Sequence, residues 1–250
     1  MTGNHVGNDS LPIFQDVDAV LFDLDGTLIE TDNRWARIAA ERLASLRRIL
    51  PRLDPEALGR RLVMASESPV NYAMSLLEHL GLGSSFLGLA DLVRRSKGVA
   101  TRDSAVLVQG TMELLEALQQ QYRMAVVTTR ARAEAQAFVE RAGLKRFFRV
   151  MITRQDVWHM KPHPEPIRRA AARLGVAVER CLMVGDTAMD IRAARRAGAY
   201  AVGVLSGFGE QRELEHAGAH LILDYAVQLS GFLPLAGQIP ELATSDPQPG

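Results

Sequence analysis

The sequence of 250 residues has almost no cysteine, no excess of charge and no long apolar run. Cys181 is the only cysteine, which excludes an intrachain disulfide and a cysteine-rich zinc site. Lysine and arginine together number 29, aspartate and glutamate also number 29, and the formal net charge is therefore zero. Such a chain has no overall field that would attract nucleic acid or anionic lipid, so attraction for an anion has to be local.

Targeting and anchoring signals are also missing from the sequence. The first residues, MTGNHVGNDSLPIF, contain neither the basic region nor the apolar region of a signal peptide. No run of about 18 uninterrupted apolar residues occurs, so we expect no transmembrane helix. These absences favour a cytoplasmic protein without a membrane or nucleic-acid partner.

Short apolar runs of the β type alternate with helical patterns along most of the chain. The runs occupy 18–23, 123–128, 148–153, 180–186, 199–205 and, more weakly, 220–224. Helices are predicted between them at 111–121, 164–175 and 189–198. Continuously apolar strands that alternate with helices are typical of a parallel sheet covered on both faces. The sequence therefore predicts an α/β fold.

The alternation is interrupted once, between residues 31 and 104, where no convincing strand occurs. Apolar residues recur there at helical spacing, and Pro and Gly separate the successive helical patterns. We therefore expect an inserted all-helical domain after the first strand. The predicted organisation is a flexible leader at 1–14, a core formed by 15–30 and 105–240, the helical insertion at 31–104, and a flexible tail at 241–250.

Polar side chains follow four of the predicted strands at the points where these strands end. Asp23 and Asp25 follow the first, Thr128 and Thr129 the second, Lys161 the third, and Asp186 and Asp190 the fourth. In an open parallel sheet, ligands bind outside the carboxyl ends of the strands. We therefore expect four carboxylates, a hydroxyl group and an ammonium group to converge at one edge of the sheet.

This set of groups indicates chemistry on a phosphoryl group. Clustered carboxylates repel one another unless a hard cation lies among them, and oxygen ligands suit Mg²⁺. Lys161 and Thr128 can hold an anion, and Gly26 and Thr27 allow a sharp turn whose N–H groups can face it. One aspartate of the first pair can attack as a nucleophile, and the other, two residues on, can move a proton.

The stretches DLDGT, Thr128, KPHPEP and GDTAMD resemble, in order and spacing, the four motifs of the haloacid dehalogenase (HAD) superfamily. DGTL, KPHPEP and AGAYAVGV look most like its phosphoglycolate-phosphatase-like branch. The resemblance covers about residues 17–226. It implies a Rossmann-like three-layer core with a helical cap domain inserted after the first strand, where the helical block lies.

The resemblance also implies roles for individual residues. Asp23 would be the nucleophile and a Mg²⁺ ligand, and Asp25 would be the general acid and base, with its backbone carbonyl on the metal. Thr128 and Lys161 would hold the phosphoryl group, Asp186 would ligate Mg²⁺, and Asp190 would support the metal. Gly26, Thr27, Thr129 and Arg52 are the further candidates for substrate binding. Arg52 is chosen because it lies in the break LPRLDP between two predicted cap helices, and in capped relatives that loop points at the active site.

Three positions depart from the pattern of the superfamily. Thr129 stands where the second motif usually has Asn, so a hydroxyl group replaces an amide. Glu30 stands where many relatives have Asp, and Gln109 where they often have Pro. The two histidines beside the lysine of KPHPEP, His159 and His163, are expected to be loop residues and not metal ligands.

The expected function is Mg²⁺-dependent hydrolysis of a small phosphorylated metabolite through an aspartyl-phosphate. Phosphoglycolate, a sugar phosphate, a nucleotide or pyrophosphate would suit such a core. One alternative is a phosphomutase resembling beta-phosphoglucomutase, which would share the core and differ in the cap. Another is a non-catalytic regulatory or binding member of the family. A dehalogenase is disfavoured because those relatives lack an acid at the position of Asp25. A monomer and a homodimer both stay open.

Overall fold

The computed structural model describes residues 14–30 and 106–235. The predicted helical cap domain at 31–104, its candidate Arg52 and the predicted tail at 241–250 lie outside the described residues. Most of the predicted leader also lies outside them. The predicted domain bounds therefore stay a prediction.

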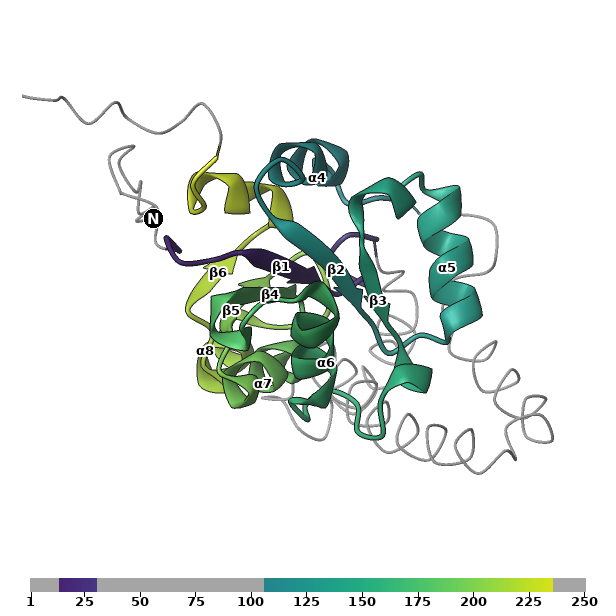
Figure 1. The fold of residues 1–250 in the computed structure, drawn as a ribbon. Coiled ribbons are helices and arrows are strands. Elements are labelled where there is room, and N and C mark those ends of the chain that lie inside the picture. Colours follow the sequence, from purple (N-terminus) through teal and green to yellow (C-terminus); the bar gives the residue numbers. More distant parts are fainter. Residues whose placement is uncertain (1–13, 31–105, 236–250) are drawn as a thin grey trace, which may run out of the picture.

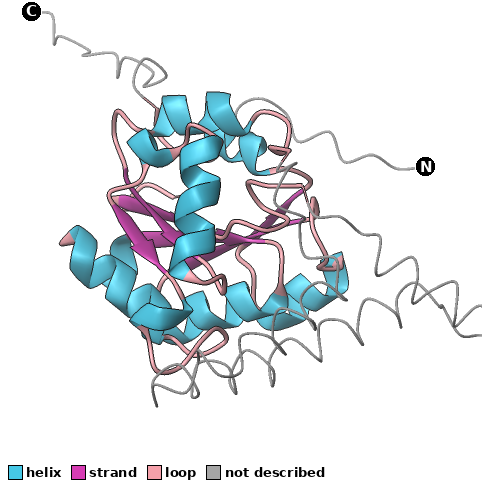
Figure 2. Cartoon of the chain, turned by 90° about the vertical axis from the view of Figure 1, so that its right-hand side faces the viewer, coloured by secondary structure: helices cyan, strands magenta, loops and turns pink. Residues whose placement is uncertain are grey.

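A parallel sheet forms the centre of the described part, with helices on both of its faces (Figure 1, Figure 2). It has six strands in the order β3-β2-β1-β4-β5-β6, and all neighbouring strands are parallel. The strands are β1 Ala19–Phe22, β2 Arg123–Val127, β3 Val150–Ile152, β4 Cys181–Gly185, β5 Tyr200–Val204 and β6 Leu221–Leu223. Each predicted apolar run contains one of these strands, so the α/β prediction is confirmed.

Two layers of helices cover the sheet, as Figure 2 shows. The α-helices are α4 Thr111–Leu118, α5 Arg132–Arg141, α6 Glu165–Leu174, α7 Ala188–Ala197 and α8 Gln211–Ala217. Short 3₁₀ helices are η2 Lys145–Phe147, η3 Arg154–Asp156, η4 Val178–Arg180 and η5 Ala226–Gly231. The helices α4, α6 and α7 match the three that were predicted, within a few residues at their ends. The sequence analysis missed α5 and α8.

The core consists of two apolar clusters, one on each face of the sheet. In β1, Val20 and Phe22 belong to the cluster that packs against α4, α5 and η5. The alternate residues Ala19 and Leu21 belong to the cluster under α6, α7 and α8. Successive strand residues point to opposite faces, so a strand buried on both sides has to be apolar throughout. This explains why the sheet could be recognised from continuous apolar runs.

Phe14 anchors the start of the described chain. It is fully buried, its ring lies edge-on to Tyr200 at a centroid distance of 5.3 Å, and its N–H donates to the carbonyl of Phe232. A buried aromatic ring packs with the core, and Phe14 is the last residue of the predicted leader at 1–14. Within 14–30 and 106–235, no helix is long and apolar enough to cross a membrane.

The chain leaves the core after β1 and returns to it at the same place. The N–H of Glu30 donates to the carbonyl of Val106 at 2.9 Å, and that of Val108 donates to Leu28 at 3.1 Å. Between them, Ile29 and Leu107 form an antiparallel bridge. The two ends of the segment between residues 30 and 106 are therefore fixed side by side.

Candidate active site

The register of the sheet brings three strand ends to one edge. Phe22, the last residue of β1, lies opposite Val126 of β2 and Val184 of β4. The residues that follow these strands therefore meet beyond the edge. They include Asp23, Thr128 and Asp186, all of which are buried. This edge is the carboxyl edge of the sheet, where the sequence predicts a ligand site.

Lys161 links two of the carboxylates at this edge. Its Nζ donates to Asp23 Oδ1 at 2.8 Å, to Asp190 Oδ1 at 2.5 Å and to the carbonyl of Val127 at 3.0 Å. Burial alone would lower the pKa of this ammonium group, but the charges of Asp190 and Asp23 outweigh it and raise the pKa above its usual value. Lys161 is therefore a fixed positive charge, and all three of its donors have acceptors within the protein.

Asp190 orients this lysine from the first turn of α7. Its Oδ2 accepts from the Thr187 hydroxyl at 2.5 Å and from the Thr187 N–H at 3.1 Å, while Thr187 Oγ1 caps the helix by accepting the N–H of Asp190. This reciprocal pair is a capping box. Because Lys161 takes the other oxygen, both oxygens of Asp190 are bonded within the protein. A supporting role suits Asp190 better than a direct one.

Asp186 differs because one of its oxygens has no partner among the described residues. Its Oδ2 accepts the N–H of Phe208 at 2.8 Å, whereas its buried Oδ1 accepts no hydrogen bond. Burial, followed by the charges of Asp190 and Asp23, raises the pKa of this carboxyl well above its ordinary value. A Cβ atom on Gly26 or Gly207 would come closer than 3.0 Å to the carboxylate of Asp186, so glycines enclose it tightly.

A divalent cation fits among these carboxylates. Asp23, Asp186 and Asp190 each offer one oxygen, and these oxygens lie within 4.8 Å of one another. Burial, followed by the charges of Asp190 and Asp25, raises the pKa of Asp23 to about 7, against the opposing effect of Lys161. Buried carboxylates that repel one another, one of them with an orphaned oxygen, are what a hard cation relieves. The donor set therefore fits Mg²⁺.

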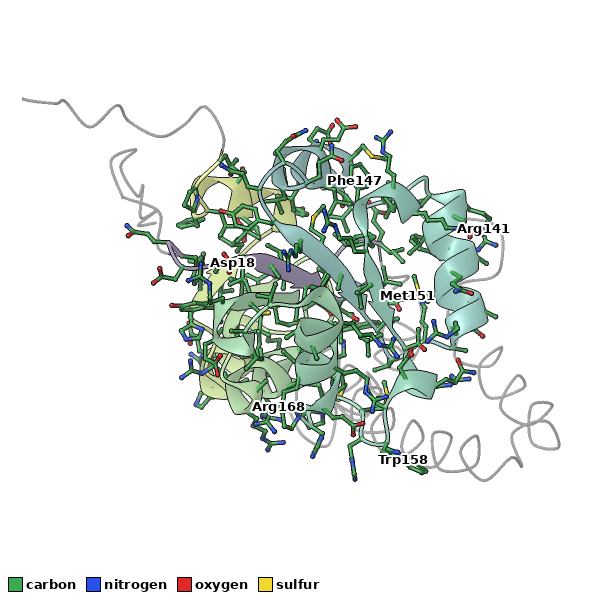
Figure 3. All side chains as sticks on the ribbon, viewed as in Figure 1. Asp18, Arg141, Phe147, Met151, Trp158 and Arg168 are labelled. Carbon is green, nitrogen blue, oxygen red and sulfur yellow. The ribbon has the colours of Figure 1, made fainter. Side chains whose placement is uncertain are left out.

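His159, His163 and Glu165 form another group with metal-ligand geometry in the described chain, and the two histidines are exposed. The Glu165 carboxylate accepts the N–H groups of Trp158 at 3.0 Å and of His159 at 3.0 Å. It therefore holds together the loop before Lys161, on which Trp158 is 61% exposed (Figure 3). These hydrogen bonds give Glu165 a structural role in this loop.

Asp25 pairs with Arg130. The guanidinium donates from Nε to Asp25 Oδ2 at 2.7 Å and from Nη2 to Asp25 Oδ1 at 2.5 Å. Its other side lies over the ring of Phe138, 5.9 Å from the centroid. Burial would lower the pKa of Arg130, but the Asp25 carboxylate raises it. The sequence analysis missed Arg130, although it follows Thr128 and Thr129 directly.

The turn after β1 is sharp, as the sequence predicts at Gly26 and Thr27. The N–H groups of these two residues donate to the carbonyls of Ile29 at 2.8 Å and Leu24 at 3.3 Å. These N–H groups close the turn itself and are not available to a ligand. Gly26 adopts a φ of 75°, which favours glycine, and its carbonyl accepts the hydroxyl of Ser206 at 2.6 Å. Thr27 Oγ1 is buried without a partner in the described part of the chain.

Thr128 and Thr129 lie at the same edge, at the end of β2. The hydroxyl oxygen of Thr128 accepts the N–H of Arg130 at 3.2 Å, which leaves the hydroxyl hydrogen free to donate. Thr128 is buried and Thr129 is half-buried. The hydroxyl of Thr128 is therefore oriented by the backbone that also places Arg130.

Comparison with known families agrees with this geometry. A profile described as haloacid dehalogenase-like hydrolase matches residues 20–204, which is most of the chain. The chain belongs to this family. The predicted resemblance is thereby confirmed.

Curated relatives of this haloacid dehalogenase-like hydrolase are similar over most of their length. A protein of Dickeya dadantii (strain 3937) named "Probable phosphatase IndB" is 31% identical over 214 residues, or 85% of this chain and 91% of that protein. Pyrophosphatase PpaX of Bacillus velezensis is 32% identical over 190 residues, or 75% of this chain and 83% of that protein.

Solved structures share the fold. A hydrolase from Pseudomonas syringae is 26% identical, with a TM-score of 0.60 over 85% of this chain and 96% of that one. A HAD family hydrolase from Deinococcus radiodurans R1, whose crystal structure is described with bound phosphate and sodium, is 25% identical with a TM-score of 0.57. That similarity covers 83% of this chain and 91% of the other.

For this haloacid dehalogenase-like hydrolase, the sequence identified the acids and the lysine but not their supporting groups. The structure brings together Asp23, Lys161, Asp186 and Asp190, and it bonds Asp25 to Arg130. The unpredicted partners are the backbone N–H of Phe208 and the hydroxyl of Ser206, in the loop after β5. Their only signal is the run SGFG at the end of the fifth strand, where another strand-end loop meets the site.

Proposed function

We propose that this chain is a Mg²⁺-dependent phosphatase that acts on a small phosphorylated compound through an aspartyl-phosphate on Asp23. That it is a hydrolase of the phosphatase type follows from its family and its relatives. The observation that carries the finer proposal is the Asp23 carboxylate, buried at a strand end, bonded to Lys161 and grouped with Asp186. The phosphate bound to the Deinococcus radiodurans hydrolase supports an anion as ligand.

The first half-reaction would transfer the phosphoryl group to the protein. The Thr128 hydroxyl would donate to a phosphoryl oxygen, and the positive charge of Lys161 would attract the phosphoryl group, while a carboxylate oxygen of Asp23 forms a bond to phosphorus. The bond from phosphorus to the leaving oxygen breaks, and the leaving group keeps the electron pair. Asp25 would give this oxygen a proton, so the products are the aspartyl-phosphate, the free leaving group and an ionised Asp25.

The second half-reaction would restore the protein. Asp25 takes a proton from water as the water oxygen bonds to phosphorus, and the bond between phosphorus and the Asp23 oxygen breaks. Inorganic phosphate leaves, Asp23 is again a carboxylate and Asp25 is again protonated. The same acid therefore serves both steps in opposite directions.

Asp23, Asp186 and the backbone carbonyl of Asp25 are the groups proposed to hold Mg²⁺, with Asp190 behind them. When bound, Mg²⁺ would supply positive charge to the phosphoryl oxygens and to the clustered carboxylates. The unpartnered Oδ1 of Asp186 is the structural reason to place the ion there. Asp190 would act through Lys161 and through the start of α7.

The test is phosphate release from a panel of phosphorylated compounds, with Mg²⁺ and with a chelator. Asp23→Asn serves as the control because it removes the nucleophile and keeps the shape of the side chain. Hydrolysis of one compound that both the chelator and Asp23→Asn abolish is the expected result. No hydrolysis by a folded protein that binds Mg²⁺ would overturn the proposal. A sugar-phosphate isomerisation assay would then separate the phosphomutase alternative from a non-catalytic binding protein.

A further inference from the structure

Arg130 is a cation at the site that the proposed reaction does not use. Lys161 is almost completely buried and is bonded to Asp23, Asp190 and the carbonyl of Val127. Arg130, in contrast, lies nearer to solvent, since the side chains of Arg130 and Asp25 are 13% and 32% exposed. Its guanidinium donates to the two oxygens of Asp25. A positive charge at the open side of a phosphate site is placed to receive a second anion.

The position of Asp25 defines which part of a substrate Arg130 would meet. In a displacement at phosphorus, the leaving group departs on the side opposite to the nucleophile. The proposed role of Asp25 requires its carboxylate to reach the leaving oxygen on that side. Because Arg130 is bonded directly to that carboxylate, the guanidinium lies on the leaving-group side as well. The ring of Phe138 lies against the guanidinium and limits its movement away from the site.

The ion pair has to open before Asp25 can act. The guanidinium donates to both oxygens of Asp25, so neither oxygen is free to approach a leaving group without losing a charge-assisted hydrogen bond. An oxyanion on the substrate can replace Asp25 on Arg130, because the planar fork of arginine fits carboxylate and phosphate equally well. The exchange keeps the guanidinium paired and releases the Asp25 carboxylate, which then takes a proton from water and can give it to the leaving oxygen.

We propose that Arg130 is the binding site for a second anionic group, a carboxylate or a phosphate, carried on the leaving group of the substrate. This inference rests on the proposed phosphatase function and specifies its substrate class. The substrates would be phosphate compounds with an oxyanion close to the scissile bond. Phosphate esters of neutral alcohols would be poorer substrates, because Arg130 would have no second anion to bind. Arg130 determines this specificity by exchanging Asp25 for the substrate.

A matched pair of esters tests this inference directly. Phosphoglycolate and 2-hydroxyethyl phosphate differ only in a carboxylate and a hydroxymethyl group, and pyrophosphate represents a phosphate as the second anion. In Arg130→Gln, kcat/KM for phosphoglycolate or pyrophosphate should fall roughly 10- to 100-fold, the usual effect of losing hydrogen bonds between charged groups. The loss should be mainly in KM. Because the variant also frees Asp25 for both esters, the decisive quantity is the ratio of kcat/KM between phosphoglycolate and 2-hydroxyethyl phosphate, which should fall roughly 10- to 100-fold.

Two further variants make the comparison specific. Arg130→Lys keeps the charge but loses the fork, so its loss on phosphoglycolate should lie between those of wild type and Arg130→Gln. Arg146→Gln is the matched control, because Arg146 also pairs with a carboxylate, Glu116 at 2.7 Å, and also lies over a phenylalanine ring, Phe147 at 4.6 Å. In Figure 3, Phe147 lies near the top of the described part and Trp158, on the loop before Lys161, near the bottom. Arg146 contacts Phe147 and is therefore on the part of the molecule away from that loop. This control should leave the preference between the two esters unchanged.

A binding measurement separates specificity from catalysis. In an Asp23→Asn background, calorimetric titration with each ester reports affinity without turnover. Phosphoglycolate should bind more tightly than 2-hydroxyethyl phosphate, and adding Arg130→Gln should abolish that difference. Thermal unfolding of each variant establishes that it is folded.

The outcomes separate failure of this inference from failure of the proposed function. If wild type hydrolyses 2-hydroxyethyl phosphate as well as the anionic substrates, or if Arg130→Gln slows both esters equally, Arg130 is not an anion site and the phosphatase proposal stands. If the wild type, folded and supplied with Mg²⁺, hydrolyses none of the compounds, the proposed function fails and the inference fails with it.

Discussion

Gly207→Ala tests the tight enclosure of Asp186. A Cβ atom at Gly207 would lie 2.6 Å from Asp186 Cβ and still closer to its carboxylate, which is nearer than real contacts allow. Gly26 also lies tightly against this carboxylate, since a Cβ there would come within 2.7 Å of Asp186 Cγ. The hydrogen bond from Phe208 holds the same oxygen, Oδ2. An alanine must therefore move the loop after β5 or turn the carboxylate away.

The expected cost follows from these contacts. Overpacking of a filled site costs about 1–3 kcal/mol. Loss of a hydrogen bond to a charged group adds about 1.5–3 kcal/mol if the Phe208 N–H is left unpaired. A movement of the loop would relieve part of the overpacking but would break the hydrogen bond from Phe208, so the two costs are not simply added. We therefore expect the free energy of unfolding to decrease by about 2–4 kcal/mol in total. Affinity for Mg²⁺ should fall about 10- to 100-fold, as when the groups that orient a metal ligand are lost.

Urea unfolding in the presence of a chelator measures the first effect, and titration with Mg²⁺ measures the second. Gly231→Ala is the matched control, because its added Cβ would meet no atom within 4 Å and its φ is not positive. This control should stay within about 0.5 kcal/mol of wild type, as substitutions on open surface do. If Gly207→Ala unfolds at the same urea concentration as the control and binds Mg²⁺ like wild type, the argument from close packing is wrong.

Three further predictions concern buried groups. Lys161→Met should cost about 3–5 kcal/mol in urea unfolding, because it leaves Asp23 and Asp190 without their cation, and adding Asp190→Asn should recover part of this loss. Burial acts to raise the pKa of the Asp156 carboxyl, but its hydrogen bonds and ion pairs outweigh burial and hold that pKa below its ordinary value of 3.8. The stabilisation that these contacts give is therefore present above pH 3.8 and is lost as the pH falls through the lowered pKa. The stability difference between wild type and Asp156→Asn, about 1–3 kcal/mol near neutral pH, should therefore vanish in acid urea titrations. Burial raises the pKa of Cys181 to about 11, so the folded protein should not react with a thiol reagent near neutral pH, whereas urea-unfolded protein should.

The strands and three helices were predictable because their local patterns agree with their surroundings. The run AVLF of β1 is buried at every position, which is what a doubly covered strand requires. The helix α6 has Pro in its first turn and ends at Gly175, so both of its ends are marked. In contrast, α5 buries only three of its ten residues and has no side-chain cap, and α8 buries only two of seven. Their apolar stripes are too narrow to stand out in the sequence.

The gathering of the acids was predictable, and their hydrogen bonds were not. Parallel strand ends meet at one edge, so Asp23 and Asp186 had to lie close together once the strands were correctly assigned. The directions of side chains and of turn N–H groups depend on contacts between distant segments. Arg130 and Asp25 are 105 residues apart, and nothing local to either predicts their pairing. The N–H group of Gly26 is likewise directed by the turn that it closes.

The hydrogen-bonded junction between residues 28–30 and 106–108 makes the core topologically independent of what is inserted there. Among the described residues, those that gather at the carboxyl edge come from 23–27, 127–190 and 206–208, outside that segment. Loop-closure entropy rises slowly, by about 0.6 kcal/mol for each doubling of length, so inserts of very different size are tolerated at such a junction. Exchanging residues 31–105 for the equivalent segment of a relative would therefore change the chain at one place only, where the two ends of the segment are hydrogen-bonded to each other. At such a junction the length of the inserted segment can differ between proteins while the described core keeps its fold.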